Sequence, residues 1–278
     1  DLIKSIKIAR NIKISVFVLG GGSNLLISDN GLKGLTIKNQ DKAKIILKPD
    51  NIIEAPAGMV LGDVVDFSIK KSLAGLEWAG GLPGTFGGAV RGNAGAFGGE
   101  IKDSIIEVLA LNNNFKLVKL SNKQCKFSYR SSIFKEKNWI VLSALIELKK
   151  GDKKVLQKQA QEKIDYRKEK HPLEYPNIGS IFKNVDLKKV PKKFKKVFLN
   201  KVKQDPFPIV PSAWFIIGAG LTGKKIGRAQ VSLKHSNYIV NLGGAKAKDV
   251  LKLIDIIKKK VKKVYGINLE TECIILGK

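Results

Sequence analysis

The chain has 278 residues, of which 44% are hydrophobic, and it carries a formal net charge of +27 at pH 7. This length is enough to bury a real core and to form two or three lobes. Because no run of about 18 uncharged apolar residues occurs, we expect no membrane-spanning helix. The first twenty residues also lack the apolar block and small-residue cleavage site of a signal peptide.

The positive charge raises the possibility of nucleic-acid binding through phosphate contacts. The lysines are spread along the whole chain, however, and the three tryptophans and five tyrosines do not alternate with basic clusters as base-stacking surfaces require. A lysine-rich proteome or general attraction for an anionic substrate explains the charge as well. We therefore expect no specific nucleic-acid partner and no membrane partner.

The cysteines and the first residue give two further expectations. Cys125 and Cys273 are far apart and lack metal-ligand spacing, so we expect two free thiols in a reducing cytoplasm and no metal site. The chain begins at Asp1 and its only methionine is Met59. From this we expect the first lobe to be truncated at its N-terminus.

The first half of the chain reads as short strands followed by one helix. Strands are predicted where apolar residues are bounded by Gly, Pro or Asn, at 15–20, 32–38, 43–49 and 51–58. Apolar residues then recur every four positions on one predicted helical face, namely Leu61, Val65, Ile69 and Leu73. Gly75 is the predicted C-terminal stop of this helix.

The second half begins with further strands and ends with a clear amphipathic helix. Strands are predicted at 105–113, 115–121 and 139–148, and a charged helix at 153–170. The lysine-rich segment 186–203 is interpreted as a solvated surface helix or loop in preference to a docking patch. A last helix starts at Asp249 and ends at Gly266, with a short strand at 273–277.

Two glycine-rich segments carry the functional signal. The first, VLGGGSNLL at 18–26, follows a strand directly, and the second, at 75–100, contains GGLPGTFGG and NAGAFGG. Backbone without Cβ atoms can adopt φ > 0 and bring its N–H groups against an anionic ligand. The pattern is neither GxGxxG nor a P-loop. It indicates either a large diphosphate-bearing cofactor held at two places or, for the first segment, a tight strand–turn connection.

The order of several blocks resembles one enzyme family. The blocks are 18–37, 81–101, YRSSIF from Tyr129, RKEKHPLEYPNIGSIFKN from Arg167, the segment 218–241 and LETECIILG near the end. Together they are similar to the UDP-N-acetylenolpyruvoylglucosamine reductase family, in the shorter form that lacks an extra tyrosine-bearing loop.

The resemblance implies an α+β fold with a vanillyl-alcohol-oxidase-type FAD-binding part and a C-terminal α+β substrate domain. We expect a first FAD-binding lobe at 1–40, a second at 41–152 and the UDP-sugar domain at 153–278, with the last strand near the active site. The implied FAD contacts in the first loop are Gly20, Gly21, Gly22, Ser23 and Asn24. In the second segment they are Gly81, Pro83, Gly84, Thr85, Gly88, Asn93, Ala94 and Gly95.

The implied reaction reduces an enolpyruvyl ether on a UDP-sugar to a lactyl ether, with NADPH as the hydride source. Hydride passes from flavin N5 to C3, and Ser180 is the implied donor of the proton to C2. Arg130 matches the family's active-site arginine, whose guanidinium suits a carboxylate. Glu272 matches the active-site glutamate, which polarises the enolate or relays a proton. Without the resemblance, Arg130 would be interpreted as a surface ion-pair partner, Ser180 as a turn residue and Glu272 as a solvated strand residue.

The UDP part is anionic and needs cationic or amide donors. Tyr129, Lys170 and Asn184 match substrate-binding positions, and Lys183 and Tyr175 are weaker candidates. His235 and Asn237 are interpreted as structural or flavin-adjacent, and no proton-transfer role is assigned to His171.

The sequence departs from the family at several places, one of which is the lysine-rich stretch after Asn184, where a usually shorter connection is lengthened. Asn177 and Ile178 replace small residues before the catalytic serine, and Arg91 stands where the family has an aromatic residue.

The resemblance predicts a cytoplasmic monomer that acts in peptidoglycan precursor synthesis, and thus in cell-wall biogenesis, cell shape and cell division. Two alternatives stay open from the sequence. One is another FAD-dependent oxidoreductase of the same fold, and the other is a non-enzymatic basic protein that binds nucleic acid.

Overall fold

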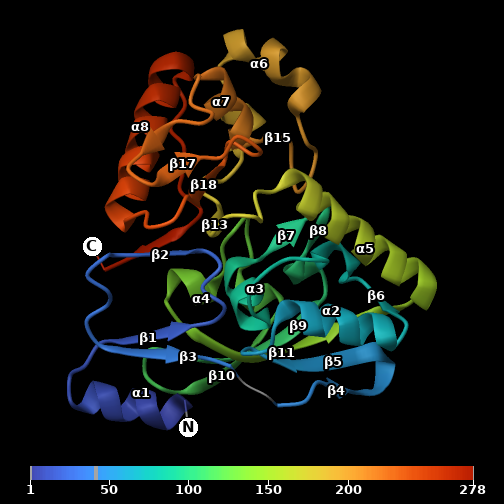
Figure 1. Ribbon diagram of the computed structural model, residues 1–278. Coiled ribbons are helices and arrows are strands. Elements are labelled where there is room, and N and C mark those ends of the chain that lie inside the picture. Colours follow the sequence, from blue (N-terminus) through green and yellow to red (C-terminus); the bar gives the residue numbers. More distant parts are fainter. Residues whose placement is uncertain (1, 41–42, 278) are drawn as a thin grey trace. The chain divides into compact units, whose positions relative to one another are not determined.

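The computed structural model describes residues 2–40 and 43–277 (Figure 1). Contacts between residues divide the chain into two compact units, which are described separately below. Unit 1 comprises Asp1–Gly22 and Lys33–Asp165, and unit 2 comprises Ser23–Leu32 and Tyr166–Lys278. The predicted lobe boundaries at 40 and 152 remain predictions, whereas the contacts place the changes of unit after residues 22, 32 and 165.

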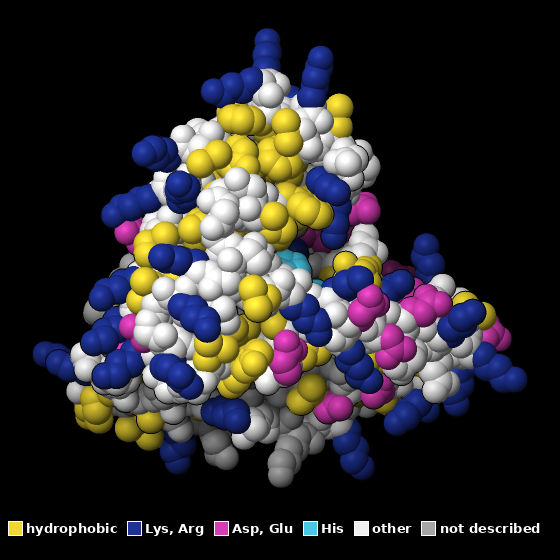
Figure 2. Space-filling model, turned by 45° about the horizontal axis from the view of Figure 1, so that its top comes forward, with side chains coloured by type: hydrophobic (Ala, Val, Ile, Leu, Met, Phe, Trp, Pro, Cys, Tyr) yellow, Lys and Arg dark blue, Asp and Glu magenta, His cyan; other side chains and the backbone are white. Residues whose placement is uncertain are grey.

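Basic side chains are scattered over the face of the molecule shown in Figure 2. Lys and Arg occur on all parts of that face and are interspersed with acidic and apolar side chains, so they do not form one continuous basic band. This distribution agrees with the spread of lysines along the sequence.

The central feature of unit 1 is a five-stranded antiparallel sheet in the order β10-β9-β11-β5-β4. The strands are β4 (Ile46–Leu47), β5 (Ile52–Pro56), β9 (Ile105–Leu111), β10 (Leu117–Ser121) and β11 (Ile140–Glu147). β11 lies in the middle, and it is rich in β-branched and apolar residues, as a central strand requires. The three strand predictions around 105–148 are thus confirmed.

Smaller elements complete unit 1. A parallel pair is formed by β1 (Val16–Leu19) and β3 (Leu35–Lys38), which confirms both of these predicted strands. Short antiparallel pairs are β6 (Leu73–Ala74) with β12 (Lys149–Lys150) and β7 (Gly95–Ala96) with β8 (Gly99–Glu100). The helices are α1 (Leu2–Asn11), α2 (Leu61–Lys70), α3 (Phe86–Gly92), α4 (Ile133–Glu136) and α5 (Lys153–Lys170), the last of which begins in unit 1.

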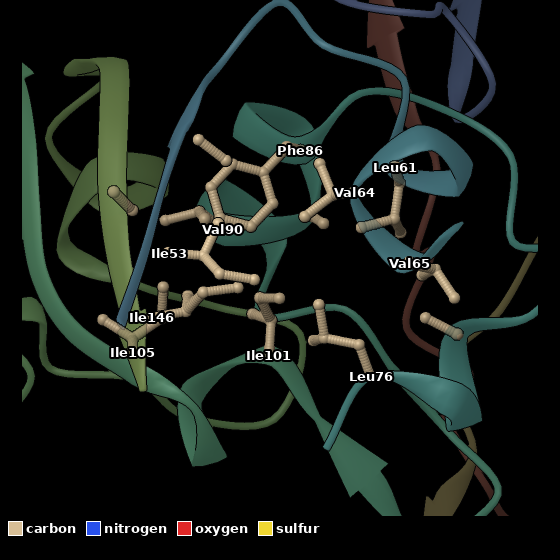
Figure 3. Packing of buried hydrophobic residues seen from close by; sticks show 14 of the residues in the cluster. Ile53, Leu61, Val64, Val65, Leu76, Phe86, Val90, Ile101, Ile105 and Ile146 are labelled. Atoms are coloured by element: carbon tan, nitrogen blue, oxygen red, sulfur yellow. The ribbon is translucent and has the colours of Figure 1, made fainter. Parts of the chain in front are cut away.

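The core of unit 1 lies between its sheet and the helices α2 and α3 (Figure 3). Phe86 at the start of α3 is fully buried and packs among apolar side chains such as Ile53 of β5 and Val64 of α2. Ile146 of β11 contributes from the centre of the sheet. Burial of such side chains contributes about 1.5–3 kcal/mol each, so this core fixes the place of the segments that precede α3.

The predicted end of the first amphipathic helix is wrong. α2 ends at Lys70, and Leu73 lies in strand β6 rather than on the helical face. The cause is Ser72, which adopts a left-handed conformation with φ of 57° and so stops the helix. Leu73 is buried, as its apolar character predicts, but it is buried as a residue of strand β6 and not as part of the helix. Gly75, with φ of 126°, belongs to the next turn.

Unit 2 contains a four-stranded antiparallel sheet in the order β13-β18-β17-β16. Its strands are β13 (Asn177–Ser180), β16 (Lys225–Ile226), β17 (Ala229–Val231) and β18 (Tyr238–Asn241). Two pairs accompany it, antiparallel β14 (Val185–Asp186) with β15 (Ile209–Val210) and parallel β2 (Leu25–Ile27) with β19 (Ile274–Leu276). The predicted C-terminal strand is therefore present as β19, and its partner is β2 near the start of the chain.

The helices of unit 2 are α6 (Lys192–Phe198), α7 (Ser212–Gly218) and α8 (Ala247–Tyr265). α8 buries Ile254, Ile257 and Val261 of the predicted apolar face, whereas Val264, also predicted on that face, is exposed. Gly266 ends the helix with φ of 71°. It starts two residues earlier than predicted, because Asp249 is the third helical residue and its carboxylate accepts the backbone N–H of Lys246 at 3.2 Å. The ring of Tyr265, the last residue of α8, packs against the rings of Phe198 and Phe215, and the centroids of the three rings lie 4.6 to 5.7 Å apart.

The lysine-rich segment is only partly as expected. It forms α6 with a 3₁₀ turn on either side, and most of its lysines are exposed. Val190 and Phe198, however, are almost fully buried and belong to the core of unit 2. The segment is thus a packed surface helix with a core-facing side.

Both cysteines are buried free thiols, as expected. Burial raises the pKa of Cys125 to about 12 and also raises the pKa of Cys273. Among the described residues, no helix combines the length and the apolar character that a bilayer crossing needs.

Candidate active site

The first glycine loop packs backbone to backbone against the second glycine segment within unit 1. A Cβ atom added to Gly21 would lie 2.8 Å from the Cα of Gly84, and one added to Gly20 would lie 2.3 Å from the Thr85 hydroxyl oxygen. Glycine is therefore required at both positions by close approach of the two segments. The structure brings together the two segments that the sequence separates by some sixty residues.

The next residue of the loop has open space instead. Gly22 has φ of 69°, and no atom would lie within 4 Å of a Cβ atom there. Gly21 and Gly22 are exposed, and within the described chain no backbone hydrogen bond uses either N–H group. Two adjacent exposed amides after a strand form a site that suits a phosphate oxygen.

The first amides of helix α3 are already used within the protein. Thr85 caps the helix and accepts the Gly88 N–H at 3.3 Å. The N–H groups of Phe86 and Gly87 donate to the carbonyls of Met59 and Ala57 at 2.8 and 2.9 Å. The anion-binding capacity of this site therefore resides in the first loop.

The second segment instead presents bare backbone. Gly81, Pro83 and Gly88 are exposed, and Gly81 and Gly84 have positive φ angles of 69° and 111°. An exposed surface without side chains allows close approach of a flat ring system. The cradle of unit 1, formed by residues 20–22 and 81–88, thus fits the cofactor that the sequence predicts, with amides for a diphosphate and open backbone beside it.

Asn93, another predicted cofactor contact, supports the loop from inside. It is fully buried, and its side-chain amide donates to Glu100 at 3.2 Å and to the Ser128 carbonyl at 3.0 Å. Its side-chain oxygen accepts the Lys102 N–H at 3.2 Å. The neighbouring Ala94 bonds through its N–H to the Ala89 carbonyl at 2.9 Å. These bonds fix the turn that leads to Gly95.

Arg130 lies against this turn. One of its guanidinium nitrogens, Nη2, donates to the carbonyl of Gly95 at 2.8 Å, and the guanidinium carbon lies 4.9 Å from the centre of the Tyr129 ring. The backbone of Arg130 is in the left-handed region with φ of 56°, which is costly for a residue with a long side chain. The Lys135 ammonium donates to its carbonyl at 2.9 Å and holds it there. The guanidinium of Arg130 is thus held in place against the turn at Gly95.

Ser180 lies in unit 2 at the end of β13, where it is half-buried. Asn237 clamps the residues that follow it, because its backbone carbonyl accepts the Ile181 N–H and its side chain exchanges two hydrogen bonds with the backbone of Phe182 at 2.8 and 3.0 Å. Before it, Asn177 accepts the Gly179 N–H at 3.0 Å. The residue that departs from the family pattern therefore fixes the turn that presents the serine.

Glu272 lies beside the serine segment in the same unit. Its N–H donates to the Ile181 carbonyl at 2.8 Å, directly after Ser180. The side-chain amide of Asn24 donates to the Glu272 carbonyl at 3.3 Å, and the Ile274 N–H donates to the Asn24 carbonyl at 3.0 Å. Asn24, predicted as a cofactor contact, therefore also supports the glutamate segment. The third predicted catalytic residue, Arg130, lies in unit 1.

A cluster that sequence analysis missed adjoins Ser180. Tyr238 is the cross-strand partner of Ser180 in the β13–β18 pair, and their side chains share a hydrogen bond. The Tyr238 hydroxyl also lies 3.2 Å from Nδ1 of His171. Burial lowers the pKa of His171 to about 4, so this ring is neutral at pH 7, and neighbouring cationic groups such as Arg167 lower its pKa further. Burial lowers the pKa of His235 as well.

The predicted substrate contacts are distributed differently. Lys170 is exposed at the end of α5 and pairs with Glu169, whose hydrogen bond and charge raise the Lys170 pKa. Asn184 accepts the backbone N–H of Ser212 at 3.3 Å. Lys183 lies 3.5 Å from Glu270, and Tyr175 is exposed. Lys170, Lys183 and Asn184 belong to unit 2, whereas Tyr129 belongs to unit 1.

Comparisons with known proteins cover both parts of the chain. The family model described as FAD binding domain matches residues 1–121, and the model described as the C-terminal domain of UDP-N-acetylenolpyruvoylglucosamine reductase matches residues 171–276. The predicted fold class, an FAD-binding part followed by a C-terminal α+β domain, is therefore confirmed.

Relatives match over almost the whole length. A UDP-N-acetylenolpyruvoylglucosamine reductase from Caldanaerobacter subterraneus is 41% identical over 100% of this chain and 84% of the relative. One from Clostridium novyi is 38% identical over 98% of this chain and 81% of the relative. The crystal structure of a UDP-N-acetylenolpyruvylglucosamine reductase from Thermus caldophilus superposes with a TM-score of 0.74 at 29% identity, covering 98% of this chain and 89% of that one. This chain belongs to the UDP-N-acetylenolpyruvoylglucosamine reductase family.

Proposed function

We infer that this chain reduces UDP-N-acetylglucosamine enolpyruvate to UDP-N-acetylmuramate, with FAD as bound cofactor and NADPH as reductant, in the synthesis of peptidoglycan precursors. The observation that carries the inference is the 41% identity to a reductase of that name over the full chain. The structure supports it independently, because Ser180 and Glu272 come together on neighbouring segments of one unit.

The cofactor cradle in unit 1 supports the role of FAD. The exposed amides of Gly21 and Gly22 would hold the diphosphate, and the bare backbone at Gly81, Pro83 and Gly88 would face the ring system. When bound, FAD supplies the hydride, received from NADPH, that reaches C3 of the enolpyruvyl group. The chain's own residues then have two tasks, which are to stabilise the negative charge on the substrate and to protonate C2.

Charge stabilisation is the role we propose for Arg130 and Glu272. The Arg130 fork, held by the Gly95 carbonyl and stacked on Tyr129, is pre-organised to bind the substrate carboxylate. Glu272 polarises the enolate or relays a proton. Ser180 gives its hydroxyl proton to C2, and the clamp formed by Asn237 keeps the serine backbone fixed during that transfer.

For the UDP part of the substrate we propose three polar contacts, those that the sequence predicts. Lys170 supplies an exposed cation for the diphosphate, Asn184 an amide, and Tyr129 an aromatic hydroxyl. The excess of 51 Lys and Arg over 24 Asp and Glu favours the approach of this anionic substrate. We further propose that the enzyme is a cytoplasmic monomer with no nucleic-acid or membrane partner.

The test follows the cofactor through both half-reactions. The purified protein, reconstituted with FAD, is mixed anaerobically with NADPH and then with UDP-N-acetylglucosamine enolpyruvate while flavin absorbance is recorded. We expect bleaching by NADPH and recovery with the substrate. Ser180→Ala should bleach normally but recover at least 100-fold more slowly, whereas the exposed control Ser121→Ala should behave as wild type.

Each other outcome points elsewhere. A flavin that bleaches but does not recover in the wild-type protein would favour another FAD-dependent oxidoreductase. A protein that takes up no FAD would contradict the flavoenzyme assignment, and salt-dependent binding to DNA would then favour the nucleic-acid alternative. Normal recovery in Ser180→Ala would contradict only the proton-donor role.

A further inference from the structure

The mechanism leaves unassigned a group of polar side chains behind Ser180. Tyr238 is only 8% exposed, yet its hydroxyl lies between two polar partners, the Ser180 side chain across the β13–β18 pair and Nδ1 of His171 at 3.2 Å. The His171 ring packs against the rings of Tyr238 and His235, with centroids 5.2 and 5.6 Å apart. This arrangement forms a continuous line from the serine hydroxyl to a histidine.

We propose that Tyr238 and His171 form a hydrogen-bonded chain that orients the Ser180 hydroxyl and returns a proton to it after each turnover. The proposal rests on the proposed function and adds positioning residues to it. Neither Tyr238 nor His171 needs to touch the substrate, because both act through Ser180.

The chemistry of serine explains why such a chain is needed. A serine hydroxyl is a weak acid, so its proton leaves readily only if the developing alkoxide meets a donor. A phenol has one proton and can donate one hydrogen bond while accepting another. The productive arrangement therefore has His171 Nδ1–H donating to the Tyr238 oxygen, Tyr238 O–H donating to Ser180 Oγ, and Ser180 O–H directed to C2 of the substrate.

Protons and bonds balance along this line. As the Ser180 O–H bond breaks and the C2–H bond forms, the Tyr238 proton moves to Ser180 Oγ and the His171 Nδ1 proton moves to the Tyr238 oxygen. His171 takes a replacement proton from solvent at Nε2. Each residue ends neutral, and a change of the imidazole tautomer restores the starting arrangement.

The charges around the chain suit this role. The charged or titratable groups near the chain are Arg167 and Glu272 at Tyr238, and His235, Arg167, Lys234, Lys203 and Tyr166 at His171. Burial raises the pKa of Tyr238, which keeps the phenol protonated, whereas the charge of Arg167 lowers it. The cationic groups and burial keep His171 neutral, so it can donate from Nδ1 without carrying a permanent charge.

A purely structural reading is that Tyr238 fills the core and its hydroxyl is merely satisfied. The two readings differ in which step they affect. Loss of a structural contact would lower stability and disturb both half-reactions. Loss of the proposed chain would slow only the step in which Ser180 gives its proton.

Tyr238→Phe in the FAD-reconstituted protein separates these readings, because it removes the hydroxyl and keeps the ring. Stopped-flow absorbance should show unchanged flavin reduction by NADPH and at least tenfold slower flavin reoxidation by the enolpyruvyl substrate. The solvent deuterium isotope effect on reoxidation should rise, since proton transfer becomes more strongly rate-limiting. Tyr166→Phe is the matched control, because Tyr166 also packs its ring against His171, at 6.2 Å, but is exposed.

His171→Asn provides the second variant. It keeps an amide near the position of Nδ1 but cannot pass a proton from solvent, so reoxidation should again slow with a raised isotope effect. Wild-type reoxidation in Tyr238→Phe, or slowing of both half-reactions together with a lowered melting temperature, would overturn the proposal. If instead Ser180→Ala reoxidises normally, the proton-donor assignment under the proposed function fails first.

Discussion

Replacement of Gly21 by alanine tests the contact between the two glycine segments. The added Cβ atom would lie 2.8 Å from the Cα of Gly84, a separation that real Cβ atoms do not adopt. The neighbouring atom belongs to backbone, so the two segments must separate instead of a side chain turning away. Overpacking of this kind costs about 1–3 kcal/mol. If about 2 kcal/mol of that cost falls on the cofactor-bound state, the Kd for FAD rises roughly 30-fold.

Gly92→Ala is the matched control for this change. Gly92 is the last residue of α3, and no atom would lie within 4 Å of its added Cβ atom. Alanine is favoured over glycine in a helix by up to about 1 kcal/mol, so this variant should be as stable as wild type or slightly more so. Its FAD affinity should not change.

The assay titrates apoprotein with FAD and follows the change in flavin fluorescence, together with thermal unfolding with and without FAD. Gly21→Ala should show a weaker affinity and a smaller stabilisation by FAD than the control. An affinity within threefold of wild type would refute the reasoning, since the loop could then open by the required distance without consequence for the cofactor.

Three other results are expected. Phe86→Ala should lower the free energy of unfolding by about 3–5 kcal/mol in a urea titration, because Phe86 is fully buried in the core of unit 1. The native protein should lose stability as pH falls from about 6.5 to 4, because the unfolded chain protonates His171 first, whereas burial holds the folded pKa at about 4; stability above pH 6.5 should be independent of this ring. The expected loss is roughly 1–2 kcal/mol after allowance for solvent screening of this half-buried ring, and His171→Asn should remove it from a series of melting curves. Neither Cys125 nor Cys273 should react with a thiol reagent before unfolding, because both are buried with raised pKa values.

Local signals in the sequence predict much of the fold. The face of α8 and its stop at Gly266 follow from apolar spacing and the conformational freedom of glycine, which act within a few residues. The end of α2 was not predictable in the same way. The spacing continues to Leu73, but Ser72 adopts a left-handed conformation and Leu73 is buried by a strand pairing with residues 149–150. Tertiary pairing there overrides the helical period.

The candidate site, like the fold, is predictable from local sequence only in part. Glycine content indicates the cofactor cradle, but which glycines face a ligand and which face each other depends on the approach of Gly21 to Gly84. The place of Tyr238 behind Ser180 depends on the register of β13 with β18, which joins residues 58 positions apart and is interrupted by a bulge. No local pattern indicates such a register. The family resemblance supplied Ser180 and Glu272, but it assigned no role to Tyr238.

The parallel pair of β2 and β19 has a consequence for how the protein is made. β2 leaves the ribosome well before its partner β19, which is about 250 residues further along the chain. At synthesis rates of about 5–20 residues per second, β2 waits roughly 12–50 s before its partner exists. During that interval Leu25, Leu26 and Ile27 form an unpaired apolar edge on a nascent chain. Unit 2 therefore cannot complete its fold until β19 exists, because β19 must then capture a strand that was made about 250 residues earlier.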